Sequence, residues 1–487
     1  MTYSDGFLSA TDTSFLDLET DRQPLHIGSC LLYEGDLTAG AMIEALEASG
    51  CRRLLGQRLV EAPFRVSRPR LVTDPQFDWT RHVEEVTLAP ALDRQGIGRA
   101  VGRAFQGRLP RSRPLWKVVL LRGLACGHTA VVWKMHHALV DGVSGVRLLG
   151  ALHDASSEKP RRPSAPSGTT ATTAADLLAD GIEHQVGLAS RVLTERTLDL
   201  MTPSKWRRER DRWQSLAAVA REARARRPEV PFNGSVSGRR EYAAVELPLA
   251  DFRQVRRALG GTLHDVVRTV VSGGLGAYLR GLGIDTHGPP LQSLCPVSLR
   301  RSSDRRLGNV VSSLIAPLHV GLEDPVERLQ ADKNALNILR RSGQARALHD
   351  VAEWSEALHP ALQWAAGRLP RVGLVNTVCS HVPGPRSTLH LAGHRLRSWY
   401  PMGPLFADVG LFVAVLSYDR RLSIGLTVDR ELVPDVWDLA AAGEASYTAL
   451  FECARDAEAN APGFDATLAS HPLAVFPQSA QEFVAVH

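Results

Sequence analysis

The chain has 487 residues, of which 44% are hydrophobic and 22% are charged. This apolar content excludes a disordered chain, and the length allows two or three domains of ordinary size. Only 6% of the residues are aromatic and the net charge is a modest +5. Composition therefore argues against single-strand base stacking and against a dedicated DNA-binding protein, and we expect no nucleic-acid partner.

Cysteine usage and hydropathy indicate where the protein works. The six cysteines are scattered and form no C-x-x-C pair, which fits a reducing cytoplasm better than a disulfide scaffold. The N-terminal residues lack the basic start and apolar run of a signal peptide, and apolar runs such as 409–416 are too short to span a bilayer. We predict a cytoplasmic protein whose contact with an inner membrane or lipid body is at most peripheral.

The first third of the chain predicts alternating strands and helices. Ser9, with Asp12 three residues later, predicts a capped helix at the start. Apolar runs predict strands over 25–33, 115–121 and 129–135, and helices over 38–54 and 142–149. Residues 156–173 are rich in Ser, Thr, Pro and Ala and read as a linker, after which helices are predicted over 174–200 and 205–227.

A second apolar body begins near Glu241. Its first clear helix covers 262–282, with Thr262 as the cap and Asp265 at the third helical position. Apolar runs then predict strands over 291–299, 310–318, 389–396, 409–418 and 422–428, and a closing helix over 434–453. Because strands and helices mix without a regular period or an internal repeat, an α/β fold is predicted, but not a solenoid.

The most informative string is Met135-His136-His137-Ala138-Leu139-Val140-Asp141-Gly142, at the end of a predicted strand. The plainest interpretation is two satisfied core or surface histidines, and a metal site is a second one. Neighbouring strand residues point to opposite faces, however, and no zinc-spaced ligand set stands nearby. A neutral imidazole accepts a proton near neutral pH, so the strand end, the spacing and the Asp-Gly pair together favour a general base.

Further motifs identify a family that this sequence resembles. HHxxxDG is the signature of the superfamily of chloramphenicol acetyltransferase and peptide-synthetase condensation domains. The chain more closely resembles bacterial wax ester synthase/diacylglycerol acyltransferases, and the resemblance runs from about residue 8 to 452. The matching segments are LSATDTSFLDLE at 8–19, PLW at 114–116, PVSLR at 296–300 with GN at 308–309, VPGP at 382–385, and DR with VPD between 429 and 435.

The resemblance implies two similar chloramphenicol-acetyltransferase-like lobes, each a mixed sheet with helices, and a tunnel between them. We place the N-terminal lobe with the motif at 1–155, a flexible linker and helical crossover at 156–235, and the C-terminal lobe at 236–487. His137 is the implied catalytic base in the middle of the tunnel. Acyl-CoA enters from one side and the alcohol from the other.

The other site residues follow from the same resemblance. His136 and Asp141 belong to the catalytic loop; His136 is expected as a packed neighbour. Asp141 could orient His137 as in a triad, but we favour a structural ion pair with Arg300. Gly142 is expected because the backbone needs a tight bend or a close approach at this position. Trp116, His264, Asp265 and Asn309 are candidates for the substrate tunnel.

Two positions depart from the family pattern. His264 stands where the family usually has Asn before Asp, and His381 stands where it often has Asn before VPGP. Each change replaces a small amide with an imidazole. They bear on substrate specificity rather than on the fold.

The expected activity is transfer of a fatty acyl group from acyl-CoA to a long-chain alcohol, a diacylglycerol or both. No metal and no cofactor beyond the substrate acyl-CoA are expected. One alternative is a condensation-type enzyme with a carrier-protein-bound donor, although PLW, PVSLR and VPGP argue against it. A non-catalytic lipid-body protein is the other.

A basic segment could bring the protein to its lipids. Residues 204–227 hold nine basic and three acidic residues. Trp206 and Trp213 stand seven residues apart, near one face of a helix. This is the pattern of a helix on an anionic membrane or lipid-droplet surface, or equally of a helix packed on the second lobe.

Overall fold

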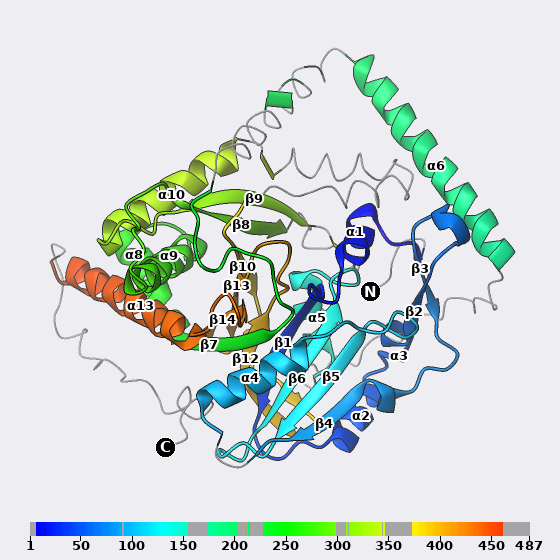
Figure 1. The fold of residues 1–487 in the computed structure, drawn as a ribbon, viewed down its shortest axis with the longest axis horizontal. Coiled ribbons are helices and arrows are strands. Elements are labelled where there is room, and N and C mark those ends of the chain that lie inside the picture. The colour runs from blue at the N-terminus through cyan, green and yellow to red at the C-terminus, as the bar shows by residue number, and fades with distance from the viewer. Residues whose placement is uncertain are drawn as a thin grey trace.

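The structure of the chain is a computed structural model. It describes residues 6–89, 92–153, 174–202, 206, 210, 213–214, 227–298, 308–309, 311–342, 344–345 and 373–460. Two six-stranded sheets form the body of the molecule, and helices pack against both of them (Figure 1). The structure therefore confirms the predicted mixed α/β class.

The first sheet is built mainly from the N-terminal third of the chain. Its strand order is β11-β12-β1-β6-β5-β4, and all neighbours are antiparallel except β4 and β5. The strands are β1 (His26–Tyr33), β4 (Val83–Thr87), β5 (Trp116–Arg122), β6 (Thr129–His136), β11 (His390–Leu391) and β12 (His394–Met402). The helices of this part are α1 (Ala10–Leu18), α2 (Ala39–Ala48), α3 (Arg52–Leu55), α4 (Arg94–Phe105) and α5 (Gly142–Ala151), and β2 (Gln57–Val60) pairs with β3 (Arg70–Thr73).

The second sheet has the order β7-β14-β13-β10-β8-β9, with β10 parallel to both of its neighbours. Its strands are β7 (Arg240–Pro248), β8 (Leu291–Ser298), β9 (Val311–Leu318), β10 (Thr377–Pro383), β13 (Leu411–Tyr418) and β14 (Arg421–Asp429). The helices α8 (Leu249–Leu259), α9 (Leu263–Gly281), α10 (Pro325–Arg341) and α13 (Val436–Ala459) lie together on one side of this sheet (Figure 1). α6 (Ala174–Leu200) extends away from both sheets.

Several predicted elements form for the predicted reason. Ser9 and Asp12 close a capping box at the start of α1, and Thr262 and Asp265 close another at the start of α9. All eight residues of β6 are buried, which agrees with its nearly continuous apolar sequence. These caps and runs carry their own local information, so the sequence located them well.

One strand departs from its predicted bounds and changes how the lobes connect. The expected strand over 389–396 is interrupted by a tight turn at Ala392 and Gly393, both of which have positive φ. The chain then continues as β12, which pairs with β1 of the first sheet, with Cys30 opposite Tyr400. β11 and β12 thus complete the sheet of the other lobe, although they lie in the range predicted for the C-terminal lobe.

A second contact joins the lobes through α4. An added Cβ on Gly98 or Gly102 would lie 2.3 or 2.2 Å from the carbonyl oxygens of Tyr242 and Arg240 in β7. Glycine at these two positions lets the helix backbone lie directly on the strand. α4 and β12 therefore tie the two sheets together from different sides.

Candidate active site

The His-His-x-x-x-Asp-Gly segment forms the turn between β6 and α5. The His136 N–H donates to the carbonyl of Leu115, and the His137 N–H donates to the carbonyl of Leu25, each at 2.9 Å. The Leu139 N–H then closes the turn on the His136 carbonyl at 3.0 Å. The backbone of the turn is thus fixed by the strands that flank β6.

His137 is half-buried and lies in the wall of a cavity. Its ring stacks on Phe15 of α1, with the ring centroids 4.1 Å apart and the planes 8° from parallel. Burial lowers the pKa of His137 to about 4, against the opposing effects of its own carbonyl and of Asp141. The imidazole is therefore neutral near pH 7, which is the form that accepts a proton.

Asn309, from the second half of the chain, holds the turn from the other side. Its side-chain amide donates to the His137 carbonyl at 2.7 Å and to Asp12 Oδ1 at 2.6 Å. Its backbone N–H also donates to Asp12 Oδ1, at 2.9 Å. Next to it, the Gly308 N–H donates to the Leu139 carbonyl at 3.2 Å. Residues 308–309 thus bind the catalytic turn and α1 at the same time.

Asp141 caps the helix that follows the turn. Its carboxylate accepts from the Ser144 N–H at 2.7 Å, and its backbone N–H donates to the Ser144 hydroxyl at 3.0 Å, which completes a capping box at the start of α5. Asp141 is buried and also lines the cavity. Arg300, its expected ion-pair partner, lies outside the described residues, so the pair remains a prediction.

Gly142 lies close to a side chain of the second lobe. An added Cβ would lie 2.9 Å from Cγ2 of Val382, on β10 of the second sheet. A side chain at this position would push the two lobes apart at the catalytic turn. Glycine here is therefore a packing requirement between the lobes.

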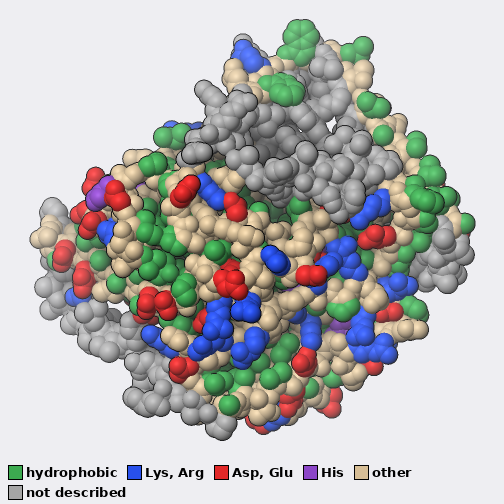
Figure 2. Space-filling view, in the orientation of Figure 1, with side chains coloured by type: hydrophobic (Ala, Val, Ile, Leu, Met, Phe, Trp, Pro, Cys, Tyr) green, Lys and Arg blue, Asp and Glu red, His purple; other side chains and the backbone are tan. Residues whose placement is uncertain are grey.

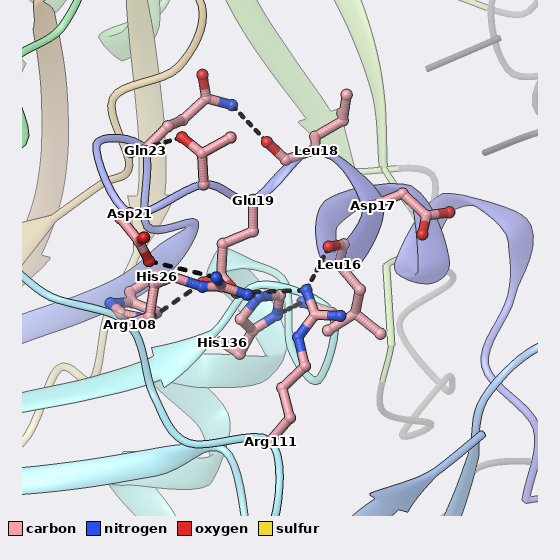
Figure 3. Close-up of polar contacts among 12 residues, drawn as sticks. Leu16, Asp17, Leu18, Glu19, Asp21, Gln23, His26, Arg108, Arg111 and His136 are labelled. Carbon is pink, nitrogen blue, oxygen red and sulfur yellow. Dashed lines mark hydrogen bonds and ion pairs between the residues drawn. The ribbon is translucent and has the colours of Figure 1, made fainter. Parts of the chain in front are cut away.

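His136 points away from the cavity into a buried polar cluster (Figure 3). Its Nδ1 accepts from the Ala138 N–H at 3.1 Å, and its Nε2 lies 3.4 Å from Glu19 Oε1. Glu19 also lies 3.6 Å from His26 Nε2 and accepts from Arg108 Nε at 3.1 Å. This agrees with the packed role expected of His136.

The cavity beside His137 has a volume of about 370 Å³ and receives side chains from both lobes. Most of its lining is apolar. The first lobe contributes Phe15, Ile27, Trp133, Met135, Val146 and Leu149, and the second contributes Leu294, Val378, Val382, Phe406, Phe412 and Leu416. Such a lining suits the alkyl chain of a lipid and leaves the imidazole as one of few titratable groups in the wall.

Of the four tunnel candidates, Asn309 lines the cavity, and the described lining does not include the other three. Trp116 is fully buried in an aromatic cluster, where it stacks on Trp133 at 5.6 Å and donates to the Leu55 carbonyl at 2.7 Å. Asp265 accepts from the Thr262 N–H at 2.8 Å as part of the cap of α9. Trp116 and Asp265 thus have structural partners that account for their burial.

The two positions that depart from the family pattern face each other. The rings of His264 and His381 stack with centroids 5.8 Å apart and planes 9° from parallel. Burial lowers the pKa of His264 to about 3, with further effects of His381, Arg268 and Arg340, and burial lowers the pKa of His381 to about 4. Because the imidazoles are in contact, we treat the two departures as one change.

Two residues of α1, and Glu19 directly after it, contact the site although the sequence predicted no site role for them. Asp12, Phe15 and Glu19 contact Asn309, His137 and His136 respectively. Asp12 and Phe15 are three residues apart and share one face of α1, whereas Glu19 is the extended residue that ends the helix. The detectable signal was one carboxylate in the predicted helix and another at its end, both among apolar residues, where a buried carboxylate is costly unless it has a partner.

No cluster of three or more His, Cys, Asp or Glu side chains that could hold a metal ion occurs within the described part of the chain. None of the described helices is both long and apolar enough to cross a membrane.

Two mixed sheets that share a cavity, with the His-His-x-x-x-Asp-Gly turn in its wall, form the site of an acyltransferase. The model of the wax ester synthase/diacylglycerol acyltransferase catalytic domain matches residues 8–267. The model of the WS/DGAT C-terminal domain matches residues 307–450. The chain therefore belongs to the wax ester synthase/diacylglycerol acyltransferase family.

Similar proteins support this assignment over nearly the whole chain. A probable diacylglycerol O-acyltransferase of Mycobacterium tuberculosis is 31% identical over 443 residues, which are 89% of this chain and 93% of the relative. A wax ester synthase/diacylglycerol acyltransferase from Marinobacter aquaeolei has a solved structure with a TM-score of 0.62 and 24% identity, covering 92% of this chain and 100% of that one. The first condensation domain of the CDA synthetase has a TM-score of 0.54 at 18% identity, covering 93% and 96%. The last two show the fold.

Proposed function

We propose that this acyltransferase moves a fatty acyl group from acyl-CoA to the hydroxyl of a diacylglycerol, a long-chain alcohol or both, with His137 as the general base. The observation that carries the proposal is a neutral imidazole in the wall of an apolar cavity between the lobes. Nδ1 of His137 is buried. Nε2 is therefore the nitrogen available to a substrate hydroxyl.

The proposed reaction needs one proton shuttle. His137 removes the proton from the acceptor hydroxyl, and the oxygen attacks the thioester carbonyl to form a tetrahedral oxyanion. Collapse of this intermediate breaks the C–S bond, and His137 returns the proton to the departing CoA sulfur. The products are an ester and free CoA, and the step requires no metal and no covalent acyl-enzyme.

The experiment that tests this function measures thiol release and identifies the ester. Purified protein is given palmitoyl-CoA with hexadecanol, with a diacylglycerol, or with neither. We expect thiol release that depends on an acceptor, and a wax ester, a triacylglycerol or both as product. Thiol release without an ester product, or no release with any acceptor, would contradict the proposal.

His137→Ala separates an enzyme from a lipid-binding protein that merely retains the motif. Loss of a general base lowers turnover by about 10²–10⁴-fold. The variant should keep the melting temperature of the wild type within a few degrees, because the ring is only half-buried. His390→Ala, which removes an exposed imidazole of β11, is the matched control and should keep full activity.

We also propose that the protein meets its lipids at an anionic membrane or lipid-droplet surface. On α6, Ile182, Val186 and Leu193 share one helical face and are 50%, 63% and 68% exposed. Trp206 and Trp213 are each 59% exposed. Figure 2 shows hydrophobic side chains along the outer edge that α6 forms. Most of the basic segment 204–227 lies outside the described residues.

A further inference from the structure

A buried carboxylate at the C-terminal end of α1 is connected to the catalytic turn through His136. The Glu19 side chain is 1% exposed. Burial alone would raise the pKa of Glu19, but His136, His26 and Arg108 hold it at about 2. The contacts are drawn in Figure 3. Burying an ionised carboxylate costs free energy unless the carboxylate is paired. The contact between Glu19 and His136 is therefore expected to have a structural or functional role.

The hydrogen bonds of the His136 ring determine its tautomer. Nδ1 accepts from the Ala138 N–H and so carries no proton. In the neutral ring the proton is therefore on Nε2, which lies 3.4 Å from Glu19 Oε1. The carboxylate favours the tautomer that leaves Nδ1 free to accept, and it restrains rotation of the ring.

The ring of His136 in turn holds the backbone that carries His137. His136 accepts from the turn twice: its ring takes the Ala138 N–H and its carbonyl takes the Leu139 N–H. Ala138 is fully buried. If the ring of His136 turned away, the Ala138 N–H would lose its partner, and the residue directly before it is His137.

We infer that Glu19 is a positioning residue for His137: through the tautomer and orientation of His136, it fixes the turn that presents the catalytic imidazole. The inference rests on the proposed role of His137 as the base. It also accounts for the buried face of α1, where Phe15 stacks on the His137 ring itself. α1 would thus hold the base from two directions.

A competing explanation is that Glu19 only anchors Arg108 and Arg111, with which it also pairs. The two explanations differ in how Glu19 and His136 depend on each other. A displacement of about 1 Å in a catalytic group lowers turnover by up to about 10²-fold. If Glu19 acts through His136, removing both groups should cost no more turnover than removing the more important one alone.

The test is a double-mutant cycle on kcat with Glu19→Ala, His136→Phe and the combined variant, assayed with palmitoyl-CoA and the acceptor that gives product. We expect each single variant to lose about 10²-fold in kcat, the double variant to lose no more, and KM to stay within a few-fold. Fold-losses that multiply, or a raised KM with unchanged kcat, would overturn the inference.

Conservative variants add a second readout. Glu19→Gln keeps an oxygen that can face Nε2 of His136, and His136→Asn keeps an acceptor for the Ala138 N–H. Both should retain kcat within about tenfold even where the melting temperature falls, whereas His136→Phe should not. Equal losses in His136→Asn and His136→Phe overturn the inference, and this pair leaves Glu19 intact should Glu19→Ala fail to fold.

Two further variants serve as controls for the cycle. Asp17→Asn removes a carboxylate of α1, two residues before Glu19, that pairs with Arg65 at 2.7 Å, and it should keep the wild-type kcat. An active His137→Ala variant would overturn the proposed function itself. An inactive His137→Ala variant beside a fully active Glu19→Ala variant would overturn the positioning role alone.

Discussion

Asn309 and Asp12 stand 297 positions apart in the sequence and hydrogen bond twice, through the side-chain amide at 2.6 Å and the backbone N–H at 2.9 Å. The same side-chain amide donates to the carbonyl of His137 at 2.7 Å. One side chain of the second lobe therefore sets the distance between α1 and the catalytic turn. Burial raises the pKa of Asp12, while the bonds from Asn309 and Ser9 oppose that rise.

Asn309→Ala should reduce both stability and turnover. It leaves the carbonyl of His137 without this donor and removes one of the two bonds to Asp12, which costs about 1–3 kcal/mol. Asn376→Ala is the control, because Asn376 is a buried amide that also donates to a backbone carbonyl, that of Pro228 at 2.8 Å, outside the catalytic turn. The control should lose melting temperature but keep kcat.

Asn309→Asp tests the contact between residue 309 and Asp12 by placing a second carboxyl group there. Two carboxyl groups would then share one buried site and disfavour double ionisation. The deficit in melting temperature relative to the wild type should therefore narrow as the pH falls from about 8 to about 5. A deficit that is constant across this range would show that the electrostatic part of the contact is unimportant.

Asp141→Ala distinguishes a helix cap from a buried ion pair. Loss of the cap of α5 costs about 1 kcal/mol. Stranding Arg300, if it is the buried partner, would raise the cost to roughly 3–5 kcal/mol. Denaturant unfolding of Asp141→Ala beside Asp324→Ala measures the difference, because Asp324 caps α10 through two backbone N–H groups.

The result decides between three roles for Asp141. A larger loss of unfolding free energy than in Asp324→Ala supports the ion pair with Arg300. An equal loss indicates that Asp141 acts only as a helix cap. Unchanged stability with lost turnover would favour the triad-like role instead. kcat of Asp324→Ala should remain that of the wild type in every case.

The stacked imidazoles of His264 and His381 should make the protein sensitive to acid. Both pKa values lie below 6.5 in the folded protein, at about 3 and about 4. As the pH falls from about 6.5 toward 4, the unfolded chain binds protons that the folded chain does not, so the free energy of unfolding decreases. This contribution is complete above pH 6.5 and is lost below it.

The variant His264→Asn with His381→Asn should remove part of this acid sensitivity. Unfolding midpoints in urea at about pH 7 and about pH 5 give the comparison. The difference between the two pH values should be smaller in the double variant than in the wild type. The amides should be tolerated, and a change in acceptor preference is the expected effect on activity. Complete inactivation would show that the family pattern misleads at these positions.

The sequence predicted what is encoded locally and missed what depends on the approach of distant segments. Caps such as Ser9 and Thr262, the buried run of β6 and the catalytic turn carry their own signals. The insertion of β12 beside β1 does not, because an isolated apolar strand fits either sheet. The pairing of Glu19 with His136 was missed for the same reason. Both partners were visible, but only the fold brings them together.

The last prediction concerns the lipid surface. If α6 and the segment after it dock on lipid, the protein should sediment with vesicles that contain anionic lipid and should dissociate as salt is added, since each basic residue contributes about 1 kcal/mol near such a surface. Trp206→Ala with Trp213→Ala should weaken binding, because both rings are well exposed. Val186→Ser with Leu193→Ser tests the apolar face of α6 in the same assay.

Ile338→Ala is the control for the lipid experiment. Ile338 is 69% exposed, as much as Leu193, but it lies on α10, which packs against α9 of the second lobe. The substitution removes an exposed apolar side chain but leaves the proposed lipid-binding face of α6 unchanged. Binding should therefore be unchanged in Ile338→Ala and reduced in the other two variants. If the tryptophan variant stays folded and binds as well as the wild type, the segment after α6 is not the anchor, and equal binding by the α6 variant excludes that helix as well.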